Sequence, residues 1–188
     1  MEATPYPKIN IEVADCFYTD AEDLIDRFDR TFEVYFGVKS RRIKCYYDLR
    51  AAYECILKSI IAYHEQPEIE RRDLIKKTER YGHKISELEV LAQNVDTDRE
   101  STVLSWGTIL DRLPVGLRYA LDAYDFIEAK ESLYYETIGD DDWLYRLRKY
   151  VGTLSKAFGE KLSCHSGIIS VRDIPMEKLL CKDYNKYS

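Results

Sequence analysis

The sequence predicts an all-α protein, and three observations carry that prediction. Apolar residues recur at three- and four-residue spacing through several long segments, which is the period of an α-helix. The 188 residues include eight glycines and five prolines, so few positions interrupt such segments. No internal repeat or Gly/Ser linker divides a chain whose length suits one domain. We expect an up-and-down bundle of four to six helices over 19–162, with an N-terminal segment over 1–18 and a C-terminal extension over 163–188.

The first helix is predicted over 20–37. Thr19 and Glu22 have the spacing of a capping box, in which each side chain satisfies a free backbone N–H at the helix start. Gly37 is a natural stop, because glycine readily adopts the left-handed conformation that ends many helices. One apolar stripe between these signals is expected to face the core: Leu24, Phe28, Phe32 and Tyr35.

The second helix, over 40–64, has the clearest periodic pattern. Asp48, Glu54 and Lys58 interrupt its apolar positions and are expected to point away from the core. Pro67 then prevents the helix from continuing. The buried stripe is predicted to consist of Tyr46, Leu49, Tyr53, Ile56, Leu57, Ile60 and Ile61.

Shorter helices are predicted in the middle of the chain. A highly charged helix covers 69–80, another follows Gly82, and a short one carries Trp106. Residues 117–138 are ambiguous. Their first half fits a helix, whereas 132–138 fits equally a strand or an extended arm.

The last long helix is predicted over 141–162. Three aspartates, 140–142, stand at its start, where negative charge suits the positive end of the helix dipole. In the tail, 168–171 fits a short strand and an amphipathic turn surrounds Met176.

Charge and sorting signals limit the classes of function. Lys and Arg number 28 against 34 Asp and Glu, a net charge of −6. Nucleic-acid binders usually carry a basic face, so RNA is an alternative partner and a mixed, solvated surface is favoured. The N-terminal residues do not have the pattern of a signal sequence, so we expect none, and no apolar run approaches the roughly 20 residues that cross a bilayer. We therefore expect a cytoplasmic protein without membrane contact.

Metal and cofactor motifs are missing from the sequence. Five cysteines are scattered without a CxxC pair, whereas structural zinc needs closely spaced ligands. The glycines form no phosphate-binding loop, and no GxSxG elbow occurs. No Glu stands three residues before a His, as a di-iron bundle requires. We expect no metal, no cofactor and free thiols in a reducing compartment.

Several short motifs resemble the HEPN superfamily in their order and spacing. The run Tyr46–Lys58, with its Glu54-x-x-Leu-Lys ending, resembles the family's long second helix. Gly82-His83 before a Leu-rich helix, Leu117-Arg118-Tyr119, and the acidic start of the final helix follow in the family's order. The resemblance covers about 20–162 and implies a bundle of four or five helices, often dimeric, in antiviral and toxin–antitoxin systems.

Many members of that family are metal-independent ribonucleases with Arg, four to six residues, then His on the final helix. The histidine acts as acid or base, and the arginine stabilises the charge that develops on the phosphate. In this chain no Arg stands at that spacing before His64, His83 or His165. Arg146 and Arg148 lie on the predicted final helix without a following His. The sequence therefore predicts no catalytic residues.

Five residues are binding candidates, and each has a structural alternative. His83 caps a helix or bonds within the bundle; Arg118 pairs with a carboxylate such as Glu54; and the two arginines of the final helix face solvent. Sixteen tyrosines exceed what a core needs, so some are expected at an interface. The candidates are His83, Arg118, Tyr119, Arg146 and Arg148.

Three functions remain open at this point. The first is a non-catalytic HEPN-like interaction module that binds a protein partner or forms a homodimer, in a defence, counter-defence or toxin–antitoxin system. The second is a divergent metal-independent ribonuclease that combines Arg118 or Arg146 with His83 or His165. The third is an acidic decoy that occupies the nucleic-acid-binding surface of another protein.

Overall fold

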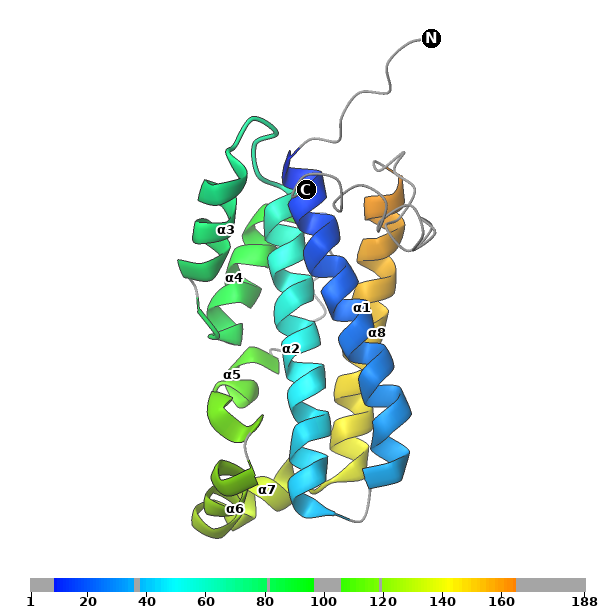
Figure 1. Ribbon diagram of the computed structural model, residues 1–188, viewed down its shortest axis with the longest axis vertical. Coiled ribbons are helices and arrows are strands. Elements are labelled where there is room, and N and C mark those ends of the chain that lie inside the picture. The colour runs from blue at the N-terminus through cyan, green and yellow to red at the C-terminus, as the bar shows by residue number, and fades with distance from the viewer. Residues whose placement is uncertain (1–8, 36–37, 81, 97–105, 119, 165–188) are drawn as a thin grey trace, which may run out of the picture.

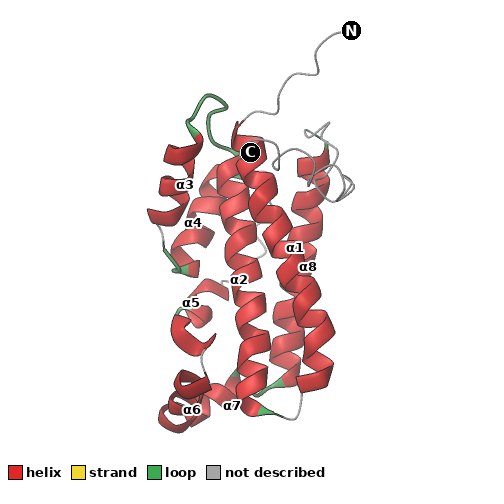
Figure 2. Cartoon of the chain, in the orientation of Figure 1, coloured by secondary structure: helices red, strands yellow, loops and turns green. Residues whose placement is uncertain are grey.

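The computed structural model describes residues 9–35, 38–80, 82–96, 106–118 and 120–164. In these ranges every regular element is helical and no strand occurs (Figure 2), which confirms the all-α prediction. There are more helices than the expected four to six, because the chain between the long helices breaks into short ones. The order is α1 (Ile9–Tyr35), α2 (Lys39–Tyr63), α3 (Arg71–Arg80), α4 (Ile85–Val95), α5 (Trp106–Leu110), the 3₁₀ helix η1 (Val115–Arg118), α6 (Ala120–Ala129), α7 (Glu131–Glu136) and α8 (Asp141–Ser163).

The long helix α2 is the centre of the bundle. It packs against α1, α4 and α8. Figure 1 shows α1 and α8 along one side of α2, α3 and α4 along the other, and α5 to α7 toward the lower end. The predicted apolar stripe of α2 is confirmed, since all seven of its members are at most 3% exposed: Tyr46, Leu49, Tyr53, Ile56, Leu57, Ile60 and Ile61.

The expectation that Asp48, Glu54 and Lys58 point away from the core is wrong. They are 9%, 8% and 9% exposed. Because neighbours cover α2 on several sides, its polar face is enclosed as well as its apolar stripe. Buried charges need partners, and these side chains have them: Arg27 donates to Asp48 and Lys58 donates to Glu54.

The first helix begins eleven positions earlier than predicted, at Ile9. Thr19 and Glu22 therefore lie inside α1, and the capping-box interpretation is wrong. Glu22 instead accepts a hydrogen bond from the Ser155 hydroxyl of α8. Burial of Ala14 and its neighbours against the core extends the helix toward the N-terminus, because tertiary packing overrides a local capping signal.

The described part of the ambiguous segment 117–138 is mostly helical. Its first residues belong to the end of η1, and α6 and α7 follow, so the strand alternative is wrong over Glu131–Glu136. Tyr134 on α7 is only 1% exposed, and its carbonyl accepts from the backbone N–H of Gly139 at 2.7 Å. The strand predicted over 168–171 and the turn around Met176 lie outside the described residues.

The start of α8 is capped as the sequence predicts. A carboxylate oxygen of Asp140 accepts a hydrogen bond from the backbone N–H of Asp142 at 2.9 Å. The buried guanidinium of Arg42 then pairs with Asp141 at 2.6 Å and donates to the carbonyl of Ile138. These contacts fasten the α7–α8 turn to the beginning of α2.

The helices α4 and α5 approach each other closely at Gly107. A Cβ atom there would lie 2.5 Å from the Cα of Ser86, so only glycine fits. The backbone N–H of Gly107 donates to the buried carboxylate of Glu89 at 2.9 Å, and the Tyr53 hydroxyl donates to the same oxygen at 2.6 Å. Glu89 thus joins α2, α4 and α5.

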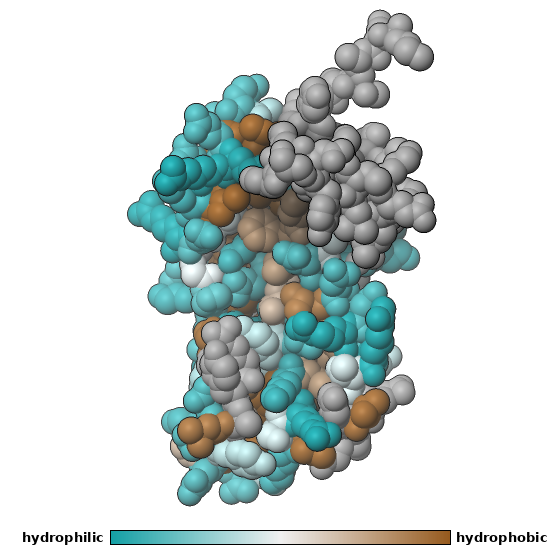
Figure 3. Space-filling view, in the orientation of Figure 1, coloured by the Kyte–Doolittle hydropathy of each residue, from teal (hydrophilic) through white to brown (hydrophobic). Residues whose placement is uncertain are grey.

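The surface is predominantly polar on the face seen in Figure 3, where apolar residues form small separate groups. None of the helices within the described ranges has both the length and the apolar character to cross a bilayer.

Candidate functional site

A buried carboxylate holds a solvent-facing imidazole at the start of α4. His83 follows Gly82, whose φ of 56° belongs to the left-handed region that glycine favours. The Nδ1 atom of His83 lies 3.1 and 3.0 Å from the two carboxylate oxygens of Glu54. The side chain of His83 is 61% exposed, whereas that of Glu54 is 10% exposed. An ionised carboxylate can only accept, so Nδ1 of His83 is the donor in this contact.

Two buried cations surround the same carboxylate. Lys58 Nζ donates to Glu54 at 2.7 Å, and Arg50 Nη1 lies 3.9 Å from the other oxygen. Arg50 also donates to the backbone carbonyl of His83 at 2.7 Å. Because Arg50, Glu54 and Lys58 are spaced by four residues, they line one face of α2. We call these three residues with His83 the Glu54 cluster.

The Glu54 cluster explains part of what sequence reasoning missed. A search along the chain for Arg and His at a fixed spacing cannot find this pair, because Arg50 lies on α2 and His83 lies in the turn before α4. The spacing of Arg50, Glu54 and Lys58 is the available signal, but the apolar pattern of the sequence predicts Glu54 and Lys58 on an exposed face and indicates no role for Arg50. Glu54 and His83 both belong to the motifs behind the HEPN resemblance, and folding places them in contact. The expected hydrogen bond of His83 within the bundle is confirmed.

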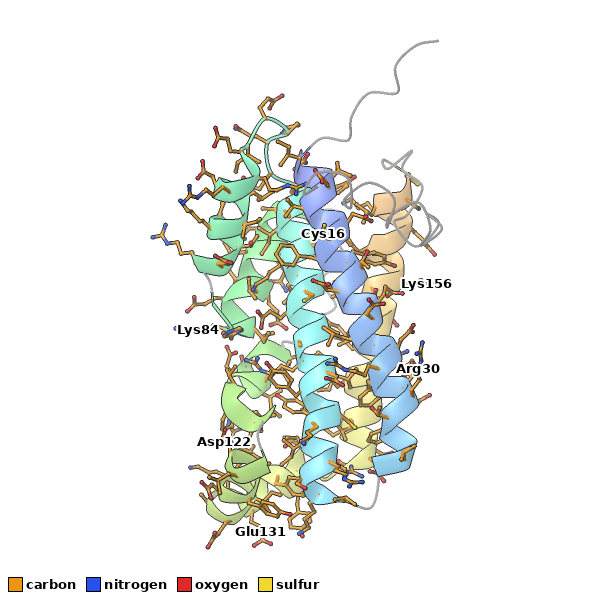
Figure 4. All side chains as sticks on the ribbon, in the orientation of Figure 1. Cys16, Arg30, Lys84, Asp122, Glu131 and Lys156 are labelled. Carbon is orange, nitrogen blue, oxygen red and sulfur yellow. The ribbon has the colours of Figure 1, made fainter. Side chains whose placement is uncertain are left out.

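The other predicted residues do not join this cluster in the described part of the chain. Arg118 ends η1, but its side chain and Tyr119 lie outside the described residues, so their roles stay predictions. Arg148 makes a two-pronged contact with Asp29, with donor–acceptor distances of 2.7 and 2.6 Å. Arg146 is exposed, and its Nε donates at 3.3 Å to a carbonyl of its own helix. Figure 4 shows Lys84, the neighbour of His83, on the edge opposite Lys156 of α8.

A groove of about 820 Å³ runs between α1 and α8. We call it the α1/α8 groove. Its two sides differ in charge. The charged residues that α1 contributes are all acidic: Glu22, Asp26 and Asp29. α8 contributes three basic residues, Arg148, Lys149 and Lys156, against one acidic residue, Glu160, and the side chain of Tyr145, which is 70% exposed.

Two glycines of α8 shape the α1/α8 groove. A Cβ at Gly152 would lie 2.2 Å from the Arg148 guanidinium, and one at Gly159 would lie 2.3 Å from the Tyr18 hydroxyl oxygen. The absent side chain at Gly152 lets Arg148 fold along α8 and reach Asp29 on α1, and the one at Gly159 leaves room for the Tyr18 ring. Arg148 is therefore occupied within the chain rather than presented to a ligand.

The tyrosines divide between core and surface. Tyr46, Tyr53 and Tyr134 are at most 1% exposed, so for these the expectation of an interface role is wrong. Tyr124, Tyr135 and Tyr145 are 62%, 49% and 70% exposed and keep that prediction open, and Tyr119 lies outside the described residues. The buried rings of α2 pack against aromatic rings of α8: Tyr53 lies edge-on to Tyr150 at a centroid distance of 5.6 Å, and Tyr46 is tilted against Trp143 at 6.0 Å.

Within the described ranges, no three His, Cys, Asp or Glu side chains gather closely enough to hold a metal ion. No family model matches the chain, and neither a curated protein nor a solved structure matches it. The HEPN resemblance therefore rests on the motif residues alone and stays a prediction.

Proposed function

We propose that this chain is a non-catalytic interaction module that binds another protein chain through the α1/α8 groove. The observation that carries the proposal is the open groove with an acidic and a basic side. Charged surfaces of this kind select a partner by complementarity and orient it. The defence or toxin–antitoxin setting that the HEPN resemblance implies would suit such a module.

The chemistry of the groove supports binding rather than catalysis. Among the described residues that line it there is neither histidine nor cysteine, the side chains that most often serve as acid–base or thiol catalysts at neutral pH. The one arginine among those described lining residues, Arg148, is already paired with Asp29. The exposed ring of Tyr145 offers an apolar body with a polar tip, which is typical of residues that anchor interfaces.

A photo-crosslinker tests this proposal inside cells. Benzoylphenylalanine replaces Tyr145 in the groove or, as the control, Tyr124 on α6, which has a similar exposure. We expect a covalent protein adduct from position 145 and none from position 124. Adducts at neither position, or equal adducts at both, would overturn the proposal.

A divergent metal-independent ribonuclease is the second candidate, because the Glu54–His83 contact favours it. A buried carboxylate bound to Nδ1 orients an imidazole and leaves Nε2 facing outward, where it could act as acid or base. The test is cleavage of a panel of structured and unstructured RNAs in EDTA. Cleavage that His83→Ala abolishes and His64→Ala retains would support this candidate. Absence of cleavage by the unaltered protein at high concentration would eliminate it.

A further inference from the structure

We propose that the partner in the α1/α8 groove is a second copy of this chain, related by a two-fold axis parallel to α1 and α8. Each copy then lays its α1 against α8 of the other. The inference rests on the proposed function, since it names the partner of the same groove.

The opposite charges of the two helices select this symmetry. α1 contains eight acidic and two basic residues, whereas α8 contains five basic and three acidic residues. A two-fold axis perpendicular to the helices would place α1 on α1, where the acidic residues repel each other. An axis parallel to the helices places α1 on α8 twice, because a two-fold interface repeats each contact. The groove is thus complementary to itself in this orientation.

The contacts within one copy fix which residues would meet. Arg148 reaches Asp29, and Ser155 donates to Glu22, so these pairs lie at the same height along the bundle. Rotation about an axis parallel to the helices leaves heights unchanged. Lys156, one position from Ser155, therefore arrives opposite Glu22 of the other copy. In the same way, Arg148 marks the height of Asp29, and Asp26 lies three residues from Asp29 on α1. Lys149, one position from Arg148, therefore arrives within about one helical turn of Asp26 of the other copy.

The charges that would form these pairs are available. Lys149 and Lys156 are exposed and show no ion pair within the described part of the chain. The Asp26 side chain is 54% exposed and has a 3.6 Å contact with Arg30 of its own helix. The groove extends from Tyr145 to Ser163, about 27 Å at 1.5 Å per residue. Two helices in contact over that length approach the roughly 800 Å² per partner that stable interfaces bury.

Light scattering on the purified chain gives the first test. The expected mass is twice 22.1 kDa, falling toward 22.1 kDa as salt is raised. Asp26→Lys alone and Lys149→Glu alone should each weaken self-association by roughly tenfold or more, because each variant places like charges together twice. An equimolar mixture of the two variants should restore the dimer, since both contacts then join opposite charges.

Matched surface changes serve as controls. Asp122→Lys on α6 and Lys76→Glu on α3 alter the net charge equally at exposed positions outside the groove, and they should leave the dimer intact. Circular dichroism verifies that every variant is folded. A monomeric unaltered chain, or swaps that act no differently from the controls, would overturn this inference. A position-145 crosslink to a different protein would do the same while leaving the proposed function standing.

Discussion

The Nδ1 atom of His83 lies 3.0 Å from one carboxylate oxygen of Glu54 and 3.1 Å from the other, so the turn before α4 is bound to the middle of α2. Arg50 holds the same turn through its hydrogen bond to the His83 carbonyl. The imidazole and the backbone carbonyl of His83 are thus held by Glu54 and Arg50, which lie on the same face of α2. This arrangement positions α4, and α5 beyond it, against the core.

Replacing Glu54 with Gln tests how far the fold depends on the Glu54 cluster. The change leaves the charges of Lys58 and Arg50 buried without a counter-charge, since their side chains are 11% and 3% exposed. Breaking a buried ion pair in this way costs about 3 kcal/mol. Urea denaturation should show that loss in the free energy of unfolding. The control is Glu87→Gln, at an exposed pair with Lys84, which should change stability little; similar losses in both variants would contradict the prediction.

Substitution of Gly107 by Ala should separate α4 from α5. The added Cβ would meet backbone atoms of Ser86 at 2.5 and 2.6 Å, and backbone cannot move aside as a flexible side chain can. Overpacking of this kind costs about 1–3 kcal/mol. Thermal denaturation measures the loss.

Gly82→Ala is the matched comparison for Gly107→Ala. No atom lies within 4 Å of its added Cβ, but φ at this position is 56°. Only the conformational cost of about 1 kcal/mol is then expected. A larger loss at Gly82 than at Gly107 would mean that backbone conformation, rather than the contact with Ser86, limits the α4–α5 region.

The long helices were predictable because their apolar period is strong and few glycines or prolines interrupt it. The start of α1 was not, since Thr19 and Glu22 carry a valid local capping signal that packing of Ala14 overrides. Likewise, 132–138 has strand-forming residues, yet most of it is helical. Burial of Tyr134 fixes α7 against the core, and the hydrogen bond from Gly139 to the Tyr134 carbonyl closes the turn that ends this helix.

The Glu54 cluster was predictable only in part. Short motifs marked Glu54 and His83, because each stands at a recognisable spacing from its own neighbours. Their contact depends on how the α3–α4 turn folds back on α2, which no pattern along the chain encodes. The α1/α8 groove could not be predicted for a related reason: its acidic and basic sides come from helices more than a hundred residues apart. The sequence alone does not show that Arg148 pairs with Asp29.

Alkaline pH should unfold the protein through two buried tyrosines. Burial raises the pKa of Tyr46 and of Tyr53 above the ordinary 10.0. Above pH 10 these two tyrosines therefore release protons in the unfolded chain that they keep in the folded chain, so the stability they contribute is fully present below pH 10 and declines as pH rises. The expected slope is about 2.7 kcal/mol per pH unit for two protons. Urea titrations across this range measure it.

Two Phe substitutions separate the tyrosines. Each should remove about 1.4 kcal/mol per pH unit, the share of one proton, from the alkaline slope, but they should differ at neutral pH. The Tyr46 hydroxyl has no hydrogen-bond partner among the described residues, so Tyr46→Phe should be nearly neutral. Tyr53→Phe removes the 2.6 Å hydrogen bond to buried Glu89 and should cost about 1–3 kcal/mol. Unchanged alkaline slopes in both variants would show that other groups control unfolding at high pH.

Cysteine reactivity tests how tightly α2 is enclosed. Cys16 and Cys164 are exposed, whereas Cys45 is buried and Cys55 is half-buried. Burial, with Asp20 and Glu54 nearby, raises the pKa of Cys55 from the ordinary 9.0 to about 12. At mildly alkaline pH its thiolate population is then roughly a thousandfold lower than that of an ordinary thiol, and the thiolate is the form that reacts.

Alkylation by iodoacetamide, followed peptide by peptide with mass spectrometry, should therefore modify Cys164 first and Cys16 next, since burial with Asp15 and Asp20 nearby raises the pKa of Cys16. Cys45 and Cys55 should react only as the protein opens, so their rates should rise with urea and, in the unfolded chain, equal those of the exposed thiols. This dependence distinguishes burial from an intrinsically slow thiol. A native-state rate for Cys55 as fast as that for Cys164 would mean that α1 does not cover α2 there, and the burial of the neighbouring Glu54 would fail with it.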